Sequence, residues 1–195
     1  MNNTRFYLNE TSRLIRELPD DQIERIVARL TECWHNGGQL FLCGNGGSAA
    51  TCSHILADFT KCLYLASGRT WRALAVTDSI PLITAWANDT SYDNVFSEQL
   101  RPWIGTGDIL LALSGSGNSP NVLLAVELAK EQGACTIGLA GYQGGKLAPL
   151  CDECIIVPCD NMQRIEDCHM VLVHVLFWTM LQEAEAATPS ATPAG

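Results

Sequence analysis

Two short loops rich in glycine and serine constrain the fold of this chain more than any other feature. The first, residues 44–48, follows the apolar run 39–43, and the second, residues 114–119, follows the run 108–113. Each loop lies where a predicted strand ends and a predicted helix begins. Glycine lets the backbone approach a ligand closely, and a helix N-terminus offers unpaired N–H groups and a dipole that favour an anion. Two such loops in one chain predict a site for a phosphorylated small molecule.

The rest of the sequence alternates short apolar runs with segments of helical periodicity. Residues 4–36 are predicted to form a pair of helices, the second of which begins near Pro19. Predicted strands cover residues 39–43, 72–76, 108–113, 135–139 and 154–158. Predicted helices cover residues 47–63, 80–88, 118–132, 144–150 and 162–185. Short apolar strands separated by helices predict an α/β fold, in which a parallel sheet is covered by helices on both faces.

The length of 195 residues fits a single domain. We expect this domain to cover residues 1–187, and the Ala-, Pro- and Thr-rich segment 188–195 to be a disordered tail. A net charge of −9 argues against non-specific nucleic-acid binding, which needs a basic surface. The N-terminus is polar, and no apolar run reaches the roughly 18 residues of a membrane-spanning helix. We therefore expect no signal peptide, no membrane segment and a cytoplasmic protein.

The nine cysteines are many for such a chain, and their number is odd. Most lie inside apolar periodic segments, which favours buried reduced thiols over disulfides. Cys151 and Cys154, with Cys159 nearby, have a spacing that is found in zinc sites. However, no second cysteine pair follows at zinc-finger spacing, and Cys154 begins an apolar run. The sequence therefore favours reduced core thiols over a zinc site here.

The second loop carries three hydroxyl groups in six residues. Ser114, Ser116 and Ser119 are separated by Gly115 and Gly117, so one turn can direct several hydroxyl and N–H groups at a phosphate. The alternative is turn and capping chemistry alone, since serine and glycine are ordinary turn residues. Neither loop contains the lysine of a Walker motif, and the first does not match the glycine spacing of dinucleotide-binding loops. The argument for a phosphate site therefore rests on the pair of loops.

Two predicted helices each carry histidine together with a carboxylate. His54 and Asp58 are four residues apart, which places them on one helix face. Glu166, His169 and His174 lie among apolar residues of the last helix. A single histidine on an apolar face is usually a core residue, but buried carboxylates need partners. The residues alone leave two possibilities open, a metal or acid–base site and an ordinary core.

Several motifs together resemble one known family. The segment Gly-Asn-Gly-Gly-Ser-Ala-Ala at 44–50 and the serine-rich loop, at this separation, are similar to the sugar isomerase (SIS) domain family, and segments 87–89, 141–145 and 164–169 add to the match. The branch most similar is phosphoheptose isomerase, and the resemblance covers residues 5–185. It implies a five-stranded parallel sheet, a homotetramer with active sites at subunit interfaces, and conversion of sedoheptulose 7-phosphate into a heptose 7-phosphate for ADP- or GDP-heptose precursors.

The resemblance also implies a set of substrate-binding residues. The serine-rich loop would hold the sugar phosphate with the help of Ser48, while Asn45 and Asp89 match positions that contact sugar hydroxyls. The family often has threonine where this chain has Gly115, so one hydroxyl contact is absent. The full expected set is Asn45, Gly46, Ser48, Asn88, Asp89, Ser114, Gly115, Ser116, Ser119 and Glu166. For Asn45 and Asp89 the alternative is a turn or capping role.

The resemblance further implies one Zn²⁺ or another divalent metal per subunit, held by His54, Asp58, Glu166 and His174. The early carboxylate would be the general base and the later histidine the general acid, so the expected catalytic residues are Asp58, Glu166 and His174. The chain departs from the family twice, with Asp58 where Glu is usual and Glu166 where Gln is usual. The first change withdraws a carboxylate by one methylene, about 1.5 Å, and the second adds an anionic ligand. His169 is expected to be a core residue or to support the ligands.

These departures leave several alternatives open. The base could have moved from Asp58 to Glu166, or the two changes could make a tighter metal site, alter the substrate or abolish activity. Isomerisation through an enediol needs a base near carbon, an acid near oxygen and stabilisation of the enediolate, which a divalent metal can supply.

The main alternative function is a non-catalytic tetrameric SIS adaptor that binds a replication initiator. A sugar-phosphate-sensing regulator ranks last, because no basic helix-turn-helix segment precedes the domain.

Overall fold

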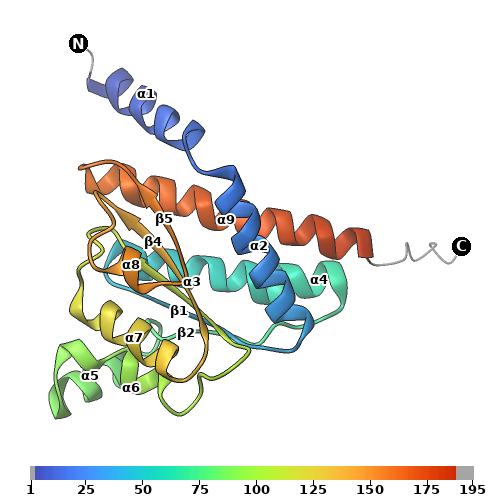
Figure 1. Ribbon diagram of the computed structural model, residues 1–195, viewed down its shortest axis with the longest axis vertical. Helices are drawn as coiled ribbons and strands as arrows, with labels where there is room; N and C mark the ends of the chain where they lie inside the picture. Colours follow the sequence, from blue (N-terminus) through green and yellow to red (C-terminus); the bar gives the residue numbers. More distant parts are fainter. Residues whose placement is uncertain (1–2, 188–195) are drawn as a thin grey trace, which may run out of the picture.

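The computed structural model describes residues 3–187 and places five parallel strands in one sheet, in the order β2-β1-β3-β4-β5 (Figure 1). Their bounds are β1 Leu40–Gly44, β2 Ala73–Ala75, β3 Ile109–Ser114, β4 Cys135–Gly141 and β5 Glu153–Val157. Every residue of β1 and β3 is buried, as expected for a parallel sheet covered on both faces. The predicted α/β fold is confirmed, and among the strands the largest difference from the predicted bounds is the extension of β4 to Gly141.

Helices fill the connections between strands and precede the sheet. Their bounds are α1 Asn3–Arg16, α2 Asp20–His35, α3 Gly47–Ala57, α4 Leu63–Ser67, α5 Ile80–Asp89, α6 Ser97–Leu100, α7 Pro120–Glu131, α8 Leu147–Leu150 and α9 Met162–Ala187. A π-helical turn, η1 (Asp58–Cys62), joins α3 to α4, and a 3₁₀ turn, η2 (Tyr92–Asn94), precedes α6. The sequence predicted the helical pair before the sheet but not η1, η2 or α6.

Two predicted helix starts were too early, and backbone geometry explains both. Helix α7 begins at Pro120 because Ser119 before it is extended, with φ −67° and ψ 117°, and proline suits the first helical position. Helix α8 begins at Leu147 because Gly144 and Gly145 have φ values of +84° and +54°, which no helix accommodates.

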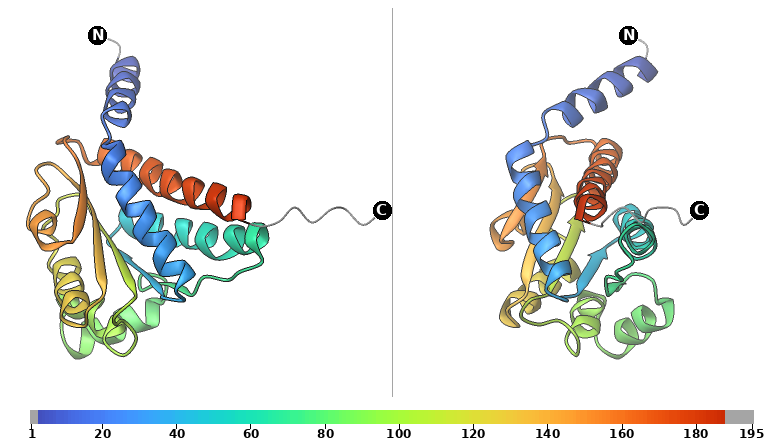
Figure 2. Two further views of the ribbon diagram at one scale, coloured as in Figure 1. Left: turned by 45° about the vertical axis from the view of Figure 1, so that its right-hand side comes forward. Right: turned by 90° about the vertical axis from the view of Figure 1, so that its right-hand side faces the viewer.

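The two faces of the sheet are covered by different helices (Figures 1 and 2). Helices α2, α3, α4 and α9 pack on one face, where Leu40, Leu42 and Leu111 point into the core. Helices α6, α7 and α8 cover the other face, which receives Phe41 and Leu110. Successive residues of a strand thus enter opposite cores, as the alternation of side chains requires. Helix α1 projects from the body in both views and packs against α9.

The strand order indicates where on the sheet a ligand would bind. From β1 the chain crosses to β2 on one side, while β3 lies on the other side, so the order reverses between β1 and β3. Gly44, the last residue of β1, is in register with Leu113, the residue before the end of β3. The loops that follow β1 and β3 therefore emerge side by side at the carboxyl ends of adjacent strands. Open α/β sheets bind ligands at such a reversal.

All nine cysteines are free, which agrees with the predicted reduced thiols. Burial raises the pKa of the Cys151 thiol to about 12 and that of Cys154 to about 11. Within residues 3–187, the side chains that could hold a metal gather elsewhere, so the structure gives no support to a zinc site at this pair. No helix in the described part of the chain is long and apolar enough to cross a membrane. The predicted tail, 188–195, lies outside the described residues.

His169 is a buried histidine in α9, only 1% exposed. Its Nε2–H group donates to the carbonyl oxygen of Ala140 at the end of β4, at 3.1 Å, and its Nδ1 atom has no partner. Burial lowers the pKa of the ring to about 4, with a smaller opposing effect of the Ala140 hydrogen bond. The ring is therefore neutral in the fold and ties α9 to the sheet, which matches the core role that the sequence allowed.

We expect the free energy of unfolding to fall as the pH drops from 6.5 towards 4. The unfolded chain binds a proton at the ordinary histidine pKa of 6.5, whereas the folded chain resists it until about 4. The contribution of neutral His169 is therefore complete above pH 6.5, and about 3 kcal/mol of it is lost by pH 4. Urea unfolding at several pH values would measure this loss. His169→Gln keeps an amide donor for Ala140 and does not titrate, so an equal loss in that variant would contradict the assignment.

Candidate active site

A cavity of about 230 Å³ opens at the carboxyl ends of β1 and β3. We call it the serine-loop cavity. Its lining residues are Asn45, Gly46, Gly47, Ser48, Leu113, Ser114, Gly115, Ser116, Ser119, Met162 and Glu166. Eight of the ten predicted substrate-binding residues are among them, while Asn88 and Asp89 are not. The two loops that the sequence singled out therefore form one concave site.

Both loops leave backbone donors available at a helix N-terminus. Gly46, before α3, has φ +56°, and no side chain caps that helix. Ser119 is the N-cap residue of α7, and its side chain makes no capping hydrogen bond either. The first N–H groups of α3 therefore remain for a ligand, whereas α7 begins with Pro120, which has no N–H, and its Val122 N–H donates to the Ser119 carbonyl, so the Asn121 N–H is the one that remains there. The positive ends of both helix dipoles face the cavity. Gly117, with φ +64°, donates its N–H to the Ser114 carbonyl and closes the turn that presents the serine hydroxyl groups.

Met162 occupies the space beside Gly115. A Cβ atom on Gly115 would overlap the thioether sulfur of Met162, the first residue of α9. The position where the related family often has threonine therefore lacks a side chain for a physical reason, because the α9 side chain fills that volume. No sequence pattern points to Met162, because its contact with Gly115 joins residues 47 positions apart in the chain.

The side chain of Asn45 is bound within the protein. Its amide exchanges two hydrogen bonds with the amide of Asn121, at 2.8 and 2.9 Å, and its Oδ1 atom also accepts a hydrogen bond from Tyr92 at 3.1 Å. Asn121 is buried, so the reciprocal pair anchors the first loop to α7. This geometry supports the anchoring role of Asn45 rather than a free contact with sugar hydroxyls. Neither Asn121 nor Tyr92 was predicted as a site residue.

Asn88 and Asp89 lie at the carboxyl end of α5, where both side chains are exposed. The Asn88 amide donates to Asp89 Oδ1 at 2.9 Å. Neither residue lines the serine-loop cavity of its own chain. The fold of one chain therefore does not bring these two predicted substrate contacts to the cavity.

Three of the four predicted metal ligands converge. One ligand atom each from His54, Asp58 and His174 lies within 4.8 Å of the others, in the only such group found in residues 3–187. The Nε2 atoms of the two imidazoles are 2.8 Å apart, and each is 4.0 Å from Asp58 Oδ2. Both rings are about half exposed, so the cluster is open to solvent on one side. Two imidazoles and a carboxylate with an open position suit zinc or a similar divalent ion.

Glu166, a residue of α9, lies away from this cluster and beside the N-terminal end of α3. A Cβ atom on Gly47 would be only 2.6 Å from each of the three carboxylate atoms of Glu166, so the carboxylate lies directly against the backbone there. Glu166 also lines a second cavity, of about 490 Å³, together with His54. Among the described residues it makes no hydrogen bond or ion pair, and the helix dipole favours its negative charge. Glu166 thus joins the serine-loop cavity to the histidine pair.

We expect Gly115→Thr to destabilise the fold by about 1 kcal/mol, because Met162 must move aside but its side chain is flexible. Met162→Ala should remove most of that cost, giving a coupling energy of about 0.5 kcal/mol or more in a double-mutant cycle measured by urea unfolding. Gly141→Ala is the matched contrast and should cost more. Its Cβ atom would meet Ile165 and the Gly115 carbonyl, and a backbone carbonyl cannot rotate away as the Met162 side chain can. Additive effects of the first two substitutions would contradict the packing described here.

Comparisons with known proteins agree with this geometry. The SIS domain family matches residues 6–141. The phosphoheptose isomerase of Aneurinibacillus thermoaerophilus is 40% identical over 154 residues, which are 79% of this chain and 77% of that relative. The phosphoheptose isomerase of Aliarcobacter butzleri is 37% identical over 167 residues, 86% of this chain and 88% of the relative. The solved structure of phosphoheptose isomerase from Neisseria gonorrhoeae, 32% identical, has a TM-score of 0.83 and covers 91% of this chain and 96% of its own. The chain therefore belongs to the SIS domain family and, within it, to the phosphoheptose isomerases.

Proposed function

We propose that the protein interconverts sedoheptulose 7-phosphate and a heptose 7-phosphate by metal-assisted enediol proton transfer, in the supply of ADP- or GDP-heptose precursors. The observation that carries this proposal is the arrangement along α3 and α9. The serine-loop cavity lies at one end, the histidine pair lies further along, and Glu166 lies between them. A phosphate site and a proton-transfer site are thus connected, as a phosphorylated sugar requires.

The phosphate would bind in the serine-loop cavity, where Ser114, Ser116 and Ser119 offer hydroxyl groups and the N-terminus of α7 offers the positive end of its dipole. Seven residues of α3 separate Gly47 at this cavity from His54, a rise of about 10 Å. An extended heptose chain is long enough to place its first two carbons near Glu166 and His54 while the phosphate stays in the loop. Holding the phosphate in this way would fix the reacting carbons, so that binding energy is used for positioning.

The three clustered residues His54, Asp58 and His174 fit a divalent metal, whereas Glu166 lies outside this group. When bound, such a metal would polarise the substrate carbonyl and stabilise the enediolate. His174 was predicted both to bind the metal and to act as the general acid. One Nε2 atom cannot do both, because a nitrogen that holds a metal has no proton to donate. We therefore assign His54, Asp58 and His174 to metal binding.

Glu166 is the group that we assign as general base. Both oxygens of Asp58 already have partners, since Oδ2 faces the two imidazoles and Oδ1 accepts from Cys62. The Glu166 carboxylate has none among the described residues and lies where the two cavities meet. It would take a proton from C1 of the ketose, giving the enediolate, and return that proton to C2, while the proton of the C1 hydroxyl passes to O2 and leaves an aldehyde at C1. A carboxylate within hydrogen-bond reach of both carbons can serve both steps.

We expect purified protein supplied with zinc to convert sedoheptulose 7-phosphate, and Glu166→Gln to lower kcat by about 10²–10⁴-fold, the range of general-base contributions. Metal content and KM should change little. Incorporation of solvent deuterium at the transferred position, followed by NMR, should decrease in parallel with kcat.

Asp167→Asn is the matched control, because Asp167 lines the same second cavity but is bound by the Tyr7 hydroxyl. It should leave kcat near the wild-type value. Failure of the wild-type protein to convert this substrate would reject the proposed reaction, whereas undiminished kcat in Glu166→Gln would reject Glu166 as the base.

We also propose a homotetramer with active sites at subunit interfaces. Helix α5 has no buried residue in the single chain although it is largely apolar, and Ile80 is 71% exposed. Leu65 of α4 and Trp178 of α9 are 70% and 61% exposed. Large exposed apolar patches often mark contacts with other chains. Burial of α5 against a neighbour would also bring Asn88 and Asp89 under another subunit, where they could contact its substrate.

Ile80→Glu should therefore lower the assembly state, because it would bury a charge in that contact. Sedimentation velocity would measure the species present, with the exposed Glu24→Gln on α2 as a control. A wild-type protein that sediments as a monomer, or a variant with unchanged assembly, would reject this interface.

The adaptor alternative has no support, because the matched relatives are named isomerases and a pure binding module has no need of the histidine and carboxylate cluster.

We further propose a cytoplasmic location. The nine free thiols are consistent with a reducing compartment.

A further inference from the structure

A thiol contacts the carboxylate of the His54–Asp58–His174 cluster. Cys62 Sγ lies 3.6 Å from Asp58 Oδ1 and is the hydrogen-bond donor that the described residues offer to this carboxylate. The other oxygen, Oδ2, lies 4.0 Å from the Nε2 atoms of both histidines. The two oxygens of Asp58 therefore face different partners, a thiol on one side and the imidazole pair on the other.

The π-helical turn η1 holds these two residues on a fixed support. The Asp58 carbonyl accepts from the Leu63 N–H, one residue further along than in an α-helix. Within the turn, Phe59 is fully buried, and its ring meets Trp71 and Phe177 edge-on with centroids 5.4 and 6.0 Å away. Phe177 lies on α9 three residues after His174. The turn that carries Asp58 and Cys62 is thus packed against the helix that carries His174.

We propose that Cys62 is a positioning residue, whose S–H group donates to Asp58 Oδ1 and thereby directs Oδ2 at the two imidazoles as a metal ligand. The terminal torsion of aspartate has a broad energy profile, so the carboxylate can rotate unless a partner holds it. Hydrogen bonds to the oxygen that does not bind the metal orient ligand carboxylates in this way. The inference rests on the proposed metal site and names the group that orders it.

The geometry distinguishes this role from direct ligation by sulfur. Cys62 is not part of the group whose ligand atoms lie within 4.8 Å of one another. Its sulfur approaches Oδ1, whereas the imidazoles approach Oδ2. The thiol therefore acts on Asp58 and not on the metal position. A thiol is a weak donor, but no stronger donor to Asp58 exists among the described residues.

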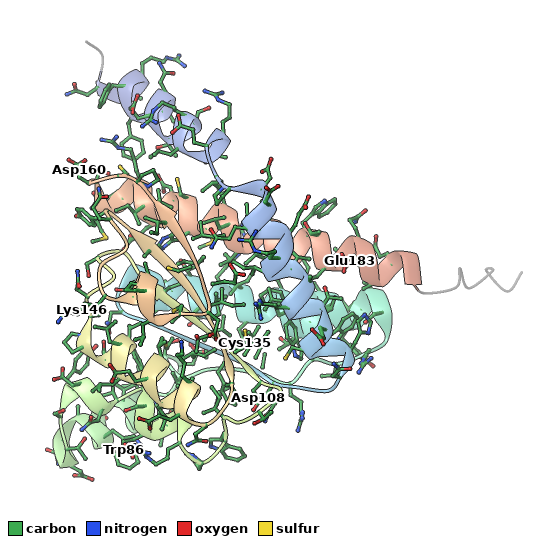
Figure 3. The ribbon with its side chains drawn as sticks, viewed as in Figure 1. Trp86, Asp108, Cys135, Lys146, Asp160 and Glu183 are labelled. Atoms are coloured by element: carbon green, nitrogen blue, oxygen red, sulfur yellow. The ribbon has the colours of Figure 1, made fainter. Side chains whose placement is uncertain are left out.

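The test measures metal binding and spectra on the full-length, metal-free protein, with Co²⁺ as the probe. Cys62→Val removes the donor and fills its place with an apolar side chain, and it should weaken Co²⁺ binding by about 10–100-fold in competition with a chromophoric chelator. Cys62→Ser restores an O–H donor and should retain the wild-type affinity. Cys135→Val, at the amino end of β4 (Figure 3), is the matched control and should bind as wild type. The wild-type spectrum should show no thiolate-to-cobalt charge-transfer band.

Wild-type affinity in Cys62→Val would overturn the proposal. A charge-transfer band that disappears in Cys62→Ser would also overturn it, because Cys62 would then be a ligand, and so would a wild-type protein that takes up no Co²⁺. Circular dichroism would confirm folding, and Cys62→Ala would replace the valine variant if that one does not fold. None of these measurements uses a sugar, so failure of the proposed isomerisation would be distinguishable from failure of this inference.

Discussion

The parallel pairing of β1 with β3 is the constraint on which the site depends. It sets Gly44 opposite Leu113, so the chain leaves both strands at the same height and the two glycine- and serine-containing loops meet. Because the strand order reverses at this pair, no crossover helix fills the space above it. A shift of register by one residue would turn every side chain of β1 to the opposite core, and Phe41 and Cys43 would exchange places with Leu40 and Leu42, whose shapes fit the other close-packed core. Hydrophobic packing thus fixes the position of a polar site.

A second constraint is the packing of α3 against α9, which extends the site beyond the loops. Gly47 and Glu166 meet at one end of this contact, and His54 and His174 meet further along. The intervals of seven and eight residues are each close to two turns, so both pairs face the same groove. Gly47 is required here because any side chain would displace the carboxylate of Glu166. One helix pair therefore carries both the unpartnered carboxylate and the metal-binding side chains.

The features that the sequence predicted are local, and those that it missed depend on distant contacts. The strands, the loop glycines and the His54–Asp58 pair follow from spacing alone, and the structure confirms that each is where expected. The amide pair of Asn45 with Asn121 and the filling of the Gly115 site by Met162 join residues far apart in the chain, which composition cannot reveal. The π-helical turn has no composition signal either, and its Phe59 packs against Trp71 and Phe177, which lie further along the chain. The roles of the individual site residues stay predictions.

The negative charge of Glu166 affects which of the two loops makes most of the contacts with the substrate phosphate. Its carboxylate lies against Gly47, at the positive end of α3, and so satisfies part of the potential that a bound anion would use. Two anions at this end would repel each other, by about 1 kcal/mol at 4 Å in water and more where solvent is excluded. Apart from Glu166, no residue that lines the cavity carries a carboxylate, and the loop before α7 adds the hydroxyl groups of Ser114, Ser116 and Ser119. We therefore expect the loop after β3 to supply most of the phosphate contacts, and the loop after β1 to position the sugar chain beside Glu166.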